Sequence, residues 1–130
     1  MSEIPADLKY TETHEWVRVE EDGTVTVGIT DHAQEMLGDI VFIELPKHDA
    51  LLRVGQECAV VESVKAAADI YAPISGEVVD INETLQSTSA TVNGDPYGEG
   101  WLFCVKPSDM NELENLLSAD EYNEQLSAES

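Results

Sequence analysis

The stretch Cys58-Ala-Val-Val-Glu-Ser-Val-Lys65-Ala-Ala-Ala-Asp-Ile-Tyr-Ala72 decides the fold of this chain. It consists of two runs of extended-chain character, residues 58–64 and 66–72, and a proline and a glycine close the second run. Such a pattern predicts two strands joined at a tight turn with Lys65 at its tip. The small alanines that follow the lysine would leave its amine clear of neighbouring side chains.

Lys65 is also isolated in charge, because no other basic residue lies between Arg53 and Lys106. An exposed turn lysine that protects a strand edge from aggregation is the ordinary interpretation, and pattern alone favours it. The functional alternative is a lysine presented for acylation, which needs a nucleophilic amine on a flexible stem. These residues by themselves leave both interpretations open.

Outside this stretch, strand signals continue to about residue 105. Residues 16–20 and 24–29 flank a Glu-Asp-Gly turn and predict a hairpin with one buried face. Residues 40–45 have apolar side chains on both faces, which predicts a strand covered on both sides. Residues 77–82 and 101–105 are two more expected strands. In the first of these, we expect Val79 and Ile81 to share one face.

Two other segments have helical or loop signals. Thr30 or Asp31 can cap a short helix that Gly38 would end. The polar, turn-rich residues 86–100 predict a long loop.

After residue 107 the apolar period becomes helical. Glutamates follow Asp109 and Ser118 at the three-residue spacing of a capping box. One apolar stripe is formed by Leu113, Leu116 and Leu117, and a shorter one by Tyr122 and Leu126.

The organisation is therefore that of a mainly β (α+β) domain. We expect one domain over residues 1–130, with a β core at about 10–106 and a C-terminal helical segment at about 107–127. A faint internal repeat, in which residues 23–30 resemble 76–83 and residues 38–44 resemble 100–106, suits a quasi-twofold β-sandwich.

Composition excludes several functions. The 130 residues include 27 Asp and Glu against 6 Lys and Arg, a formal net charge of −21. Such a chain cannot displace counterions from nucleic acid, and it would be repelled by an anionic membrane. No signal peptide or transmembrane run is visible, so a cytoplasmic protein is expected.

The sequence gives little support for an enzymatic function. Cys58 and Cys104 lie in apolar runs, where a buried, inert thiol is expected. His14 has acidic neighbours, but they are not diagnostic in so acidic a chain. The three histidines show no metal-ligand spacing, and no phosphate-binding loop is present. No self-contained active site and no metal site are therefore predicted.

The chain closely resembles the glycine cleavage system H proteins, which are small lipoyl carriers. The resemblance covers nearly the whole chain and is carried by residues 10–17, 27–34, 38–46, 62–67, 69–79 and 96–102. It implies a lipoyl-domain-like barrel-sandwich hybrid with short N-terminal elements and C-terminal helices.

By that resemblance, Lys65 carries lipoate through an amide bond. Related biotin carriers place methionines on both sides of the lysine, whereas this chain has Val64 and Ala66. The preceding Glu-Ser differs from the usual context in the lipoyl domains of 2-oxoacid dehydrogenases and fits the H-protein branch.

The resemblance also implies the partners. The P protein, a pyridoxal-phosphate glycine decarboxylase, would load the arm with the aminomethyl group of glycine. The T protein, an aminomethyltransferase, would unload it, and the L protein, a dihydrolipoyl dehydrogenase, would reoxidise the arm. A lipoate ligase or octanoyltransferase would attach the cofactor. A carrier that visits three enzymes is most simply a monomer.

In the family the loaded arm is held in a surface cleft, whose residues correspond here to Thr13, Glu15 and Asp69. Carboxylates there would pair with the cationic amine on the arm. Thr13 replaces a serine of some members and Met36 a histidine near the cleft, so the contacts of the arm are expected to differ.

Two other functions remain open at this stage. The protein could be a lipoyl relay or H-like protein that donates lipoate to 2-oxoacid dehydrogenases. It could also be an unmodified acidic interaction module, which the acidic C-terminal segment would favour.

Overall fold

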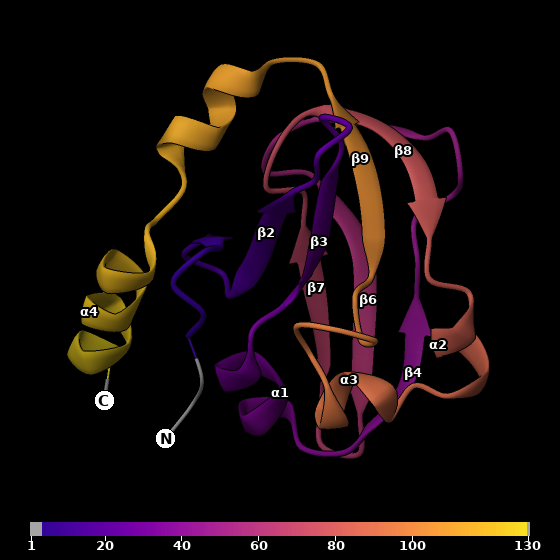
Figure 1. Ribbon diagram of the computed structural model, residues 1–130. Coiled ribbons are helices and arrows are strands. Elements are labelled where there is room, and N and C mark those ends of the chain that lie inside the picture. Colours follow the sequence, from indigo (N-terminus) through magenta and orange to yellow (C-terminus); the bar gives the residue numbers. More distant parts are fainter. Residues whose placement is uncertain (1–3, 130) are drawn as a thin grey trace.

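The computed structural model describes residues 4–129 and shows two antiparallel sheets packed face to face (Figure 1). The larger sheet has the strand order β1-β2-β3-β9-β8-β5, and the smaller has the order β4-β6-β7. The strand bounds in the larger sheet are β1 Lys9–Tyr10, β2 Glu15–Val19, β3 Val25–Ile29, β9 Phe103–Pro107, β8 Gly76–Ile81 and β5 Leu51–Leu52. Those in the smaller sheet are β4 Ile40–Glu44, β6 Glu57–Ser63 and β7 Ala67–Tyr71. The mainly β prediction is confirmed.

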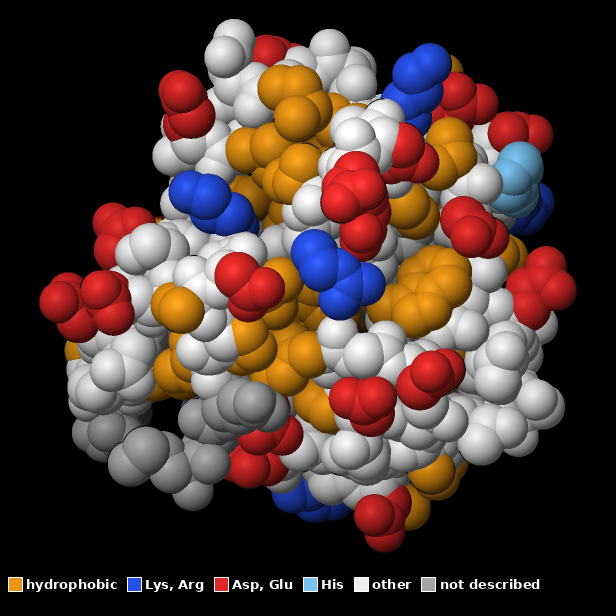
Figure 2. All heavy atoms as spheres, viewed as in Figure 1, with side chains coloured by type: hydrophobic (Ala, Val, Ile, Leu, Met, Phe, Trp, Pro, Cys, Tyr) orange, Lys and Arg blue, Asp and Glu red, His pale blue; other side chains and the backbone are white. Residues whose placement is uncertain are grey.

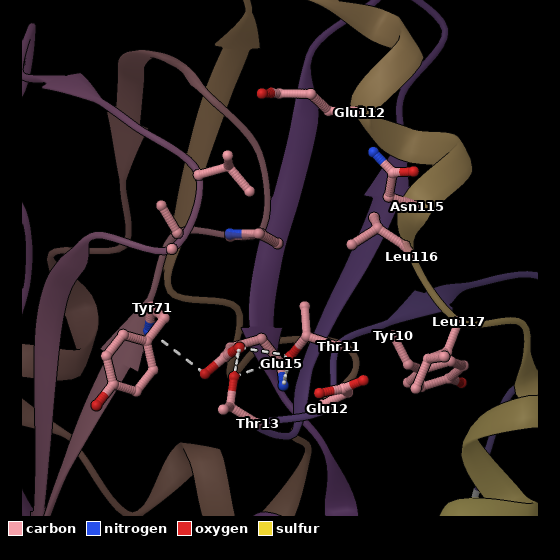
Figure 3. A pocket seen from close by; sticks show the side chains of 14 residues that line it. Tyr10, Thr11, Glu12, Thr13, Glu15, Tyr71, Glu112, Asn115, Leu116 and Leu117 are labelled. Carbon is pink, nitrogen blue, oxygen red and sulfur yellow. Dashed lines mark hydrogen bonds between the residues drawn. The ribbon is translucent and has the colours of Figure 1, made fainter.

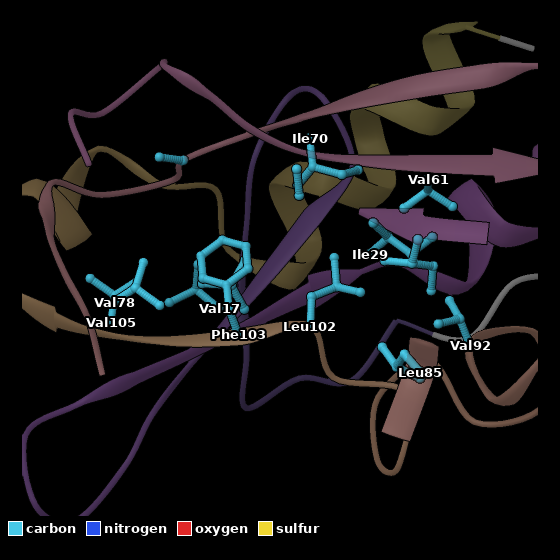
Figure 4. Packing of buried hydrophobic residues seen from close by; sticks show 14 of the residues in the cluster. Val17, Ile29, Val61, Ile70, Val78, Leu85, Val92, Leu102, Phe103 and Val105 are labelled. Carbon is cyan, nitrogen blue, oxygen red and sulfur yellow. The ribbon is translucent and has the colours of Figure 1, made fainter. Parts of the chain in front are cut away.

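The main core lies between the two sheets (Figure 4). Val17, Val78 and Phe103 enter it from the larger sheet, and Val61 and Ile70 enter it from the smaller one. Each of these five side chains is at most 4% exposed. Burial of apolar area between the sheets supplies the main driving force for this fold.

The predicted hairpin at residues 16–29 is confirmed as β2 and β3, but β3 is buried on both faces. All five residues of β3 are buried. Its outer face lies against Trp16, which pairs with Gly28 across the two strands. Trp16 belongs to a second apolar cluster with Leu8, Tyr10 and Tyr122. The expectation of a single buried face was wrong because the N- and C-terminal segments cover the other one.

Two strand predictions assigned side chains to the wrong face. In β4, Ile40 and Ile43 are buried, but Val41 and Phe42 are 56% and 48% exposed, so the strand is covered on one side only. A register shift between Ile40 and Phe42 separates the buried pair by three residues.

In β8 the buried side chain is Val78, and Val79 is not on the buried face. A register shift between Val78 and Asp80 places Val78 opposite Val105 and Ile81 opposite Phe103. Strict alternation therefore fails in both strands for the same reason, a local bulge.

Helix α1 (Asp31–Leu37) confirms the predicted caps. The Thr30 hydroxyl accepts a hydrogen bond from the Ala33 amide, and Gly38 ends the helix with φ +78°. The long loop expected at 86–100 was wrong in part, because the segment begins inside α2 (Thr84–Ser87) and contains α3 (Thr91–Gly94). Leu85 and Val92 anchor these single turns in the core.

The C-terminal segment contains the 3₁₀ helix η1 (Met110–Asn115) and helix α4 (Ala119–Glu129). The capping box at Ser118 is confirmed, because the Glu121 amide donates to Ser118 Oγ and the Ser118 amide donates to Glu121 Oε1. The box expected at Asp109 forms only in part: the Asp109 carboxylate caps η1 by accepting a hydrogen bond from the Asn111 amide, but Glu112 does not return one. The Glu112 carboxylate instead accepts hydrogen bonds from the amide and hydroxyl of Ser75.

Helix α4 is held to the β core through Tyr122, which is fully buried. Its ring stacks on Tyr10 at 4.7 Å between centroids. Its hydroxyl lies 2.7 Å from His14 Nδ1 and 2.7 Å from Thr30 Oγ1. This contact ties the end of the chain to the residues that cap α1.

Acidic side chains are spread widely over the face seen in Figure 2, with few basic ones among them. Within residues 4–129 no helix is both long and apolar enough to cross a membrane.

Candidate functional site

Lys65 lies at the tip of the β6–β7 hairpin and its side chain is exposed. Ser63 builds this turn. Its hydroxyl oxygen accepts hydrogen bonds from the backbone amides of Lys65 and Ala66, each at 3.1 Å, and its own amide donates to the Ala66 carbonyl at 2.8 Å. Sequence reasoning had not given Ser63 a role, although a serine two residues before a turn residue is a recognised turn former.

The segment that links α1 to β4 supports the tip. The Val64 amide donates to the Asp39 carbonyl at 3.1 Å. Asn93 in α3 fixes both sides of this contact, because its amide donates to the Gly38 carbonyl and its oxygen accepts from the Ile40 amide. The Lys65 side chain lies over Gly38, where an added Cβ would come within 3.3 Å of Lys65 Cε.

The amine of Lys65 makes no hydrogen bond or ion pair with any other residue in 4–129. The side chains of Asp39, Glu62 and Asp69 around the hairpin are exposed. The lysine is therefore held at its backbone and free at its reactive end.

A second feature is a groove of about 470 Å³ that includes Glu15 (Figure 3). Tyr71 lines one side of it, and Leu116 and Leu117 of the C-terminal segment line another. Glu15 is fully buried. Its Oε1 accepts hydrogen bonds from the hydroxyls of Thr11, at 2.5 Å, and Thr13, at 2.6 Å. The structure thus brings together two of the three predicted cleft residues.

Burial raises the pKa of the Glu15 carboxyl above its usual value of 4.5. Hydrogen bonds from the two threonines and the Tyr71 amide act in the opposite direction, but the loss of solvent has the larger effect. The native state consequently holds the Glu15 proton more tightly than the unfolded chain does.

Glu15→Gln is expected to make stability less dependent on pH. Because the folded pKa is raised, Glu15 contributes fully to stability below pH 4.5, and this contribution is lost as the pH rises through the folded pKa. The free energy of unfolding of Glu15→Gln relative to the wild type should therefore increase as the pH rises from 4.5 through the folded pKa, and level off above it. Urea unfolding between about pH 4 and 8 measures this difference.

Glu121→Gln is the matched control. Hydrogen bonds from the Ser118 amide and hydroxyl lower the pKa of Glu121. Its contribution to stability is present above its usual pKa and lost as the pH falls. The free energy of unfolding of Glu121→Gln relative to the wild type should therefore decrease as the pH rises. If it instead increases with pH, as expected for Glu15→Gln, the assignment for Glu15 is contradicted.

Asp69 lies apart from this pair. It is exposed on β7, between the lysine turn and Tyr71, and does not line the Glu15 groove. It lines a separate hollow with Cys58 and Val60. Burial raises the pKa of the Cys58 thiol to about 12, which makes it a poor nucleophile at neutral pH.

A two-sheet β domain that presents a lysine on a braced hairpin turn, with its amine exposed, has the arrangement that a carrier with a covalently attached group needs. In the part of the chain that the structure describes, no three His, Cys, Asp or Glu side chains gather as a metal site.

Comparison with known proteins identifies the family. The model of the glycine cleavage H-protein family matches residues 8–129. The chain is 60% identical over 126 residues to the glycine cleavage system H protein of Psychrobacter cryohalolentis, covering 97% of this chain and all of that one. It is 63% identical over 122 residues to that of Pseudoalteromonas translucida, covering 94% and 95%.

The crystal structure of a glycine cleavage system H protein from Mycobacterium marinum superposes with a TM-score of 0.88 at 43% identity, covering 95% of this chain and 99% of that one. This chain belongs to the glycine cleavage H-protein family, and the resemblance inferred from its sequence is confirmed. Its fold is the lipoyl-domain barrel-sandwich, and its role is that of a lipoyl carrier in the glycine cleavage system.

Proposed function

We propose that Lys65 carries the lipoyl group through an amide bond to its Nζ. The observation that supports this most directly is the position of the lysine, whose backbone is held by Ser63 while its amine has no partner among the described residues. The exposed Ala66 and Ala67 beside it leave room for an acyl chain. The residues present therefore fit the group.

Bound there, the lipoyl group would supply a disulfide that can take up the aminomethyl group of glycine. The P protein would load it, the T protein would unload it, and the L protein would reoxidise the dithiol that remains. The polypeptide supplies attachment, reach and docking. Tethering makes successive visits local and raises the effective concentration of the arm at each enzyme. The chain has no active site of its own in this scheme.

We further propose that the Glu15 groove receives the loaded end of the arm. An arm that folds back from Lys65 along β7 passes Asp69 before it reaches Tyr71, because both residues lie on this strand. Glu15 of β2 lies next to Tyr71, whose amide donates a hydrogen bond to its carboxylate. A cationic amine beside Glu15 would stabilise the ionised carboxylate, which burial alone disfavours. The apolar walls of the groove would limit access of water to the amine.

The intact mass of the protein purified from its own cells tests this function, together with peptide mapping around residue 65. We expect a mass increase of one lipoyl amide, located on Lys65. Protein that stays unmodified after incubation with lipoate, ATP and a lipoate ligase would contradict the proposal.

A further inference from the structure

Three exposed apolar side chains gather at the end of the small sheet where Lys65 lies. Val41 and Phe42 of β4 are 56% and 48% exposed, and Val64 in the turn is 69% exposed. Phe42 lies opposite Glu62 on β6, and Val64 is hydrogen-bonded through its amide to Asp39, just before β4. We call Val41, Phe42 and Val64 the turn patch. None of its three side chains belongs to either apolar cluster of the described fold.

The turn patch has an acidic rim. The side chains of Asp39, Glu44, Glu62 and Asp69 are exposed around it. No lysine or arginine occurs in residues 19–46, and Lys65 is the only one in residues 54–105. Apolar contact area surrounded by one sign of charge is suited to a partner with an apolar centre and a basic rim.

We propose that the turn patch docks the enzyme that acylates Lys65, and that this enzyme presents an apolar surface ringed by lysine or arginine. The inference rests on the proposed function. In the acylation step, Lys65 Nζ loses a proton and forms an amide bond to the carbonyl carbon of an activated acyl group, and the activating adenylate or carrier thiol leaves.

The length of the unmodified side chain selects this enzyme over the others. Before modification, the reactive nitrogen is only four methylene groups from the backbone of the turn. An enzyme that brings an acyl carbon to this nitrogen therefore has to contact the residues beside the turn. The loaded arm is longer, so enzymes that act on it can dock further from the turn patch.

The acidic rim of the turn patch should make the rate of acylation depend on salt concentration. Complementary charges accelerate diffusional encounter, and added salt screens them. We therefore expect the second-order rate constant for acylation to fall as ionic strength rises, while the apolar centre of the turn patch sets the lifetime of the complex.

The test compares two double variants of the unmodified protein. V41S/F42S removes most of the turn patch. V19S/L51S is the matched control, because Val19 and Leu51 are 49% and 78% exposed and lie in the other sheet. Each is incubated with lipoate, ATP and a lipoate ligase, and modification is followed by intact mass.

We expect kcat/KM for acylation of V41S/F42S to fall about tenfold or more, as for loss of a well-packed interface anchor. The control should stay within about twofold of the wild type. Thermal unfolding checks that both variants are folded. Val64→Ser provides a second probe if V41S/F42S does not fold, because only the backbone of Val64 holds the turn.

If the folded turn-patch variants are acylated at the wild-type rate, this inference is overturned and the proposed function is unaffected. If the wild type itself is not modified, the proposed function is overturned. Prolonged incubation also gives loaded V41S/F42S. This loaded variant is then assayed for glycine–bicarbonate exchange with the P protein. A fall in exchange as large as the fall in acylation would assign the turn patch to the decarboxylase and would also overturn the inference.

Discussion

Lys65→Arg is expected to abolish lipoyl loading and aminomethyl carriage while the protein stays fully folded. A guanidinium is always protonated near neutral pH and does not form the amide, so the arm cannot be attached. The substitution preserves charge and removes no side-chain contact in the described structure, because the Lys65 amine has no partner there. The expected thermal midpoint is that of the wild type.

The measurement is glycine–bicarbonate exchange with the P protein after incubation with lipoate, ATP and a lipoate ligase. Lys47→Arg, on an exposed lysine after β4, is the control and should support exchange at the wild-type rate. Exchange that persists in Lys65→Arg would show that the arm is attached elsewhere or is not needed.

Gly76→Ala is expected to have the largest effect on stability. Gly76 begins β8 and pairs with Pro107 of β9. A Cβ at this position would lie 2.3 Å from the Lys106 carbonyl oxygen and 2.5 Å from Val105 Cγ1. Because one obstacle is backbone, β8 and β9 would have to separate at the end of their pairing where Gly76 lies opposite Pro107. Overpacking of this kind costs about 2 to 3 kcal/mol or more, which lowers the thermal midpoint by roughly 10 °C.

Gly94→Ala is the matched control, because a Cβ there meets no atom within 4 Å and the residue ends the short helix α3. Its thermal midpoint should stay close to that of the wild type or rise slightly. Circular dichroism melts of both variants measure the difference. A Gly76→Ala midpoint equal to that of Gly94→Ala would mean that the β8–β9 contact relaxes at little cost.

The sequence predicted features that short-range patterns determine. The lysine turn, the caps of α1 and the capping box at Ser118 each depend on residues within four positions of one another, so local rules suffice. The stripe predicted from Leu113, Leu116 and Leu117 was correct only in part. Leu113 and Leu116 pack against the main core, whereas Leu117 joins Tyr122 and Leu126 in the second cluster.

Features that depend on distant contacts were missed. Glu112 follows Asp109 at the capping spacing, but Ser75 offers it two donors from across the fold. The bulges in β4 and β8 break the alternation from which faces were assigned. In the candidate site, the proximity of Thr13 and Glu15 was expected from family resemblance alone. The Glu15 carboxylate also accepts a hydrogen bond from the Tyr71 amide, 56 residues away, and no local pattern indicates this contact.

The freedom of the Lys65 amine has a thermodynamic consequence. A ligand or modification shifts the folding equilibrium only if it interacts differently with the folded and unfolded chains. The described fold gains nothing from this amine, so replacing the amine with an amide leaves the contacts of the fold unchanged. Formation of the amide by itself therefore does not shift the folding equilibrium. A loaded end seated in the Glu15 groove would shift it, because the unfolded chain lacks that groove, so a carrier with an aminomethyl group on its arm should be more stable than one with an empty arm.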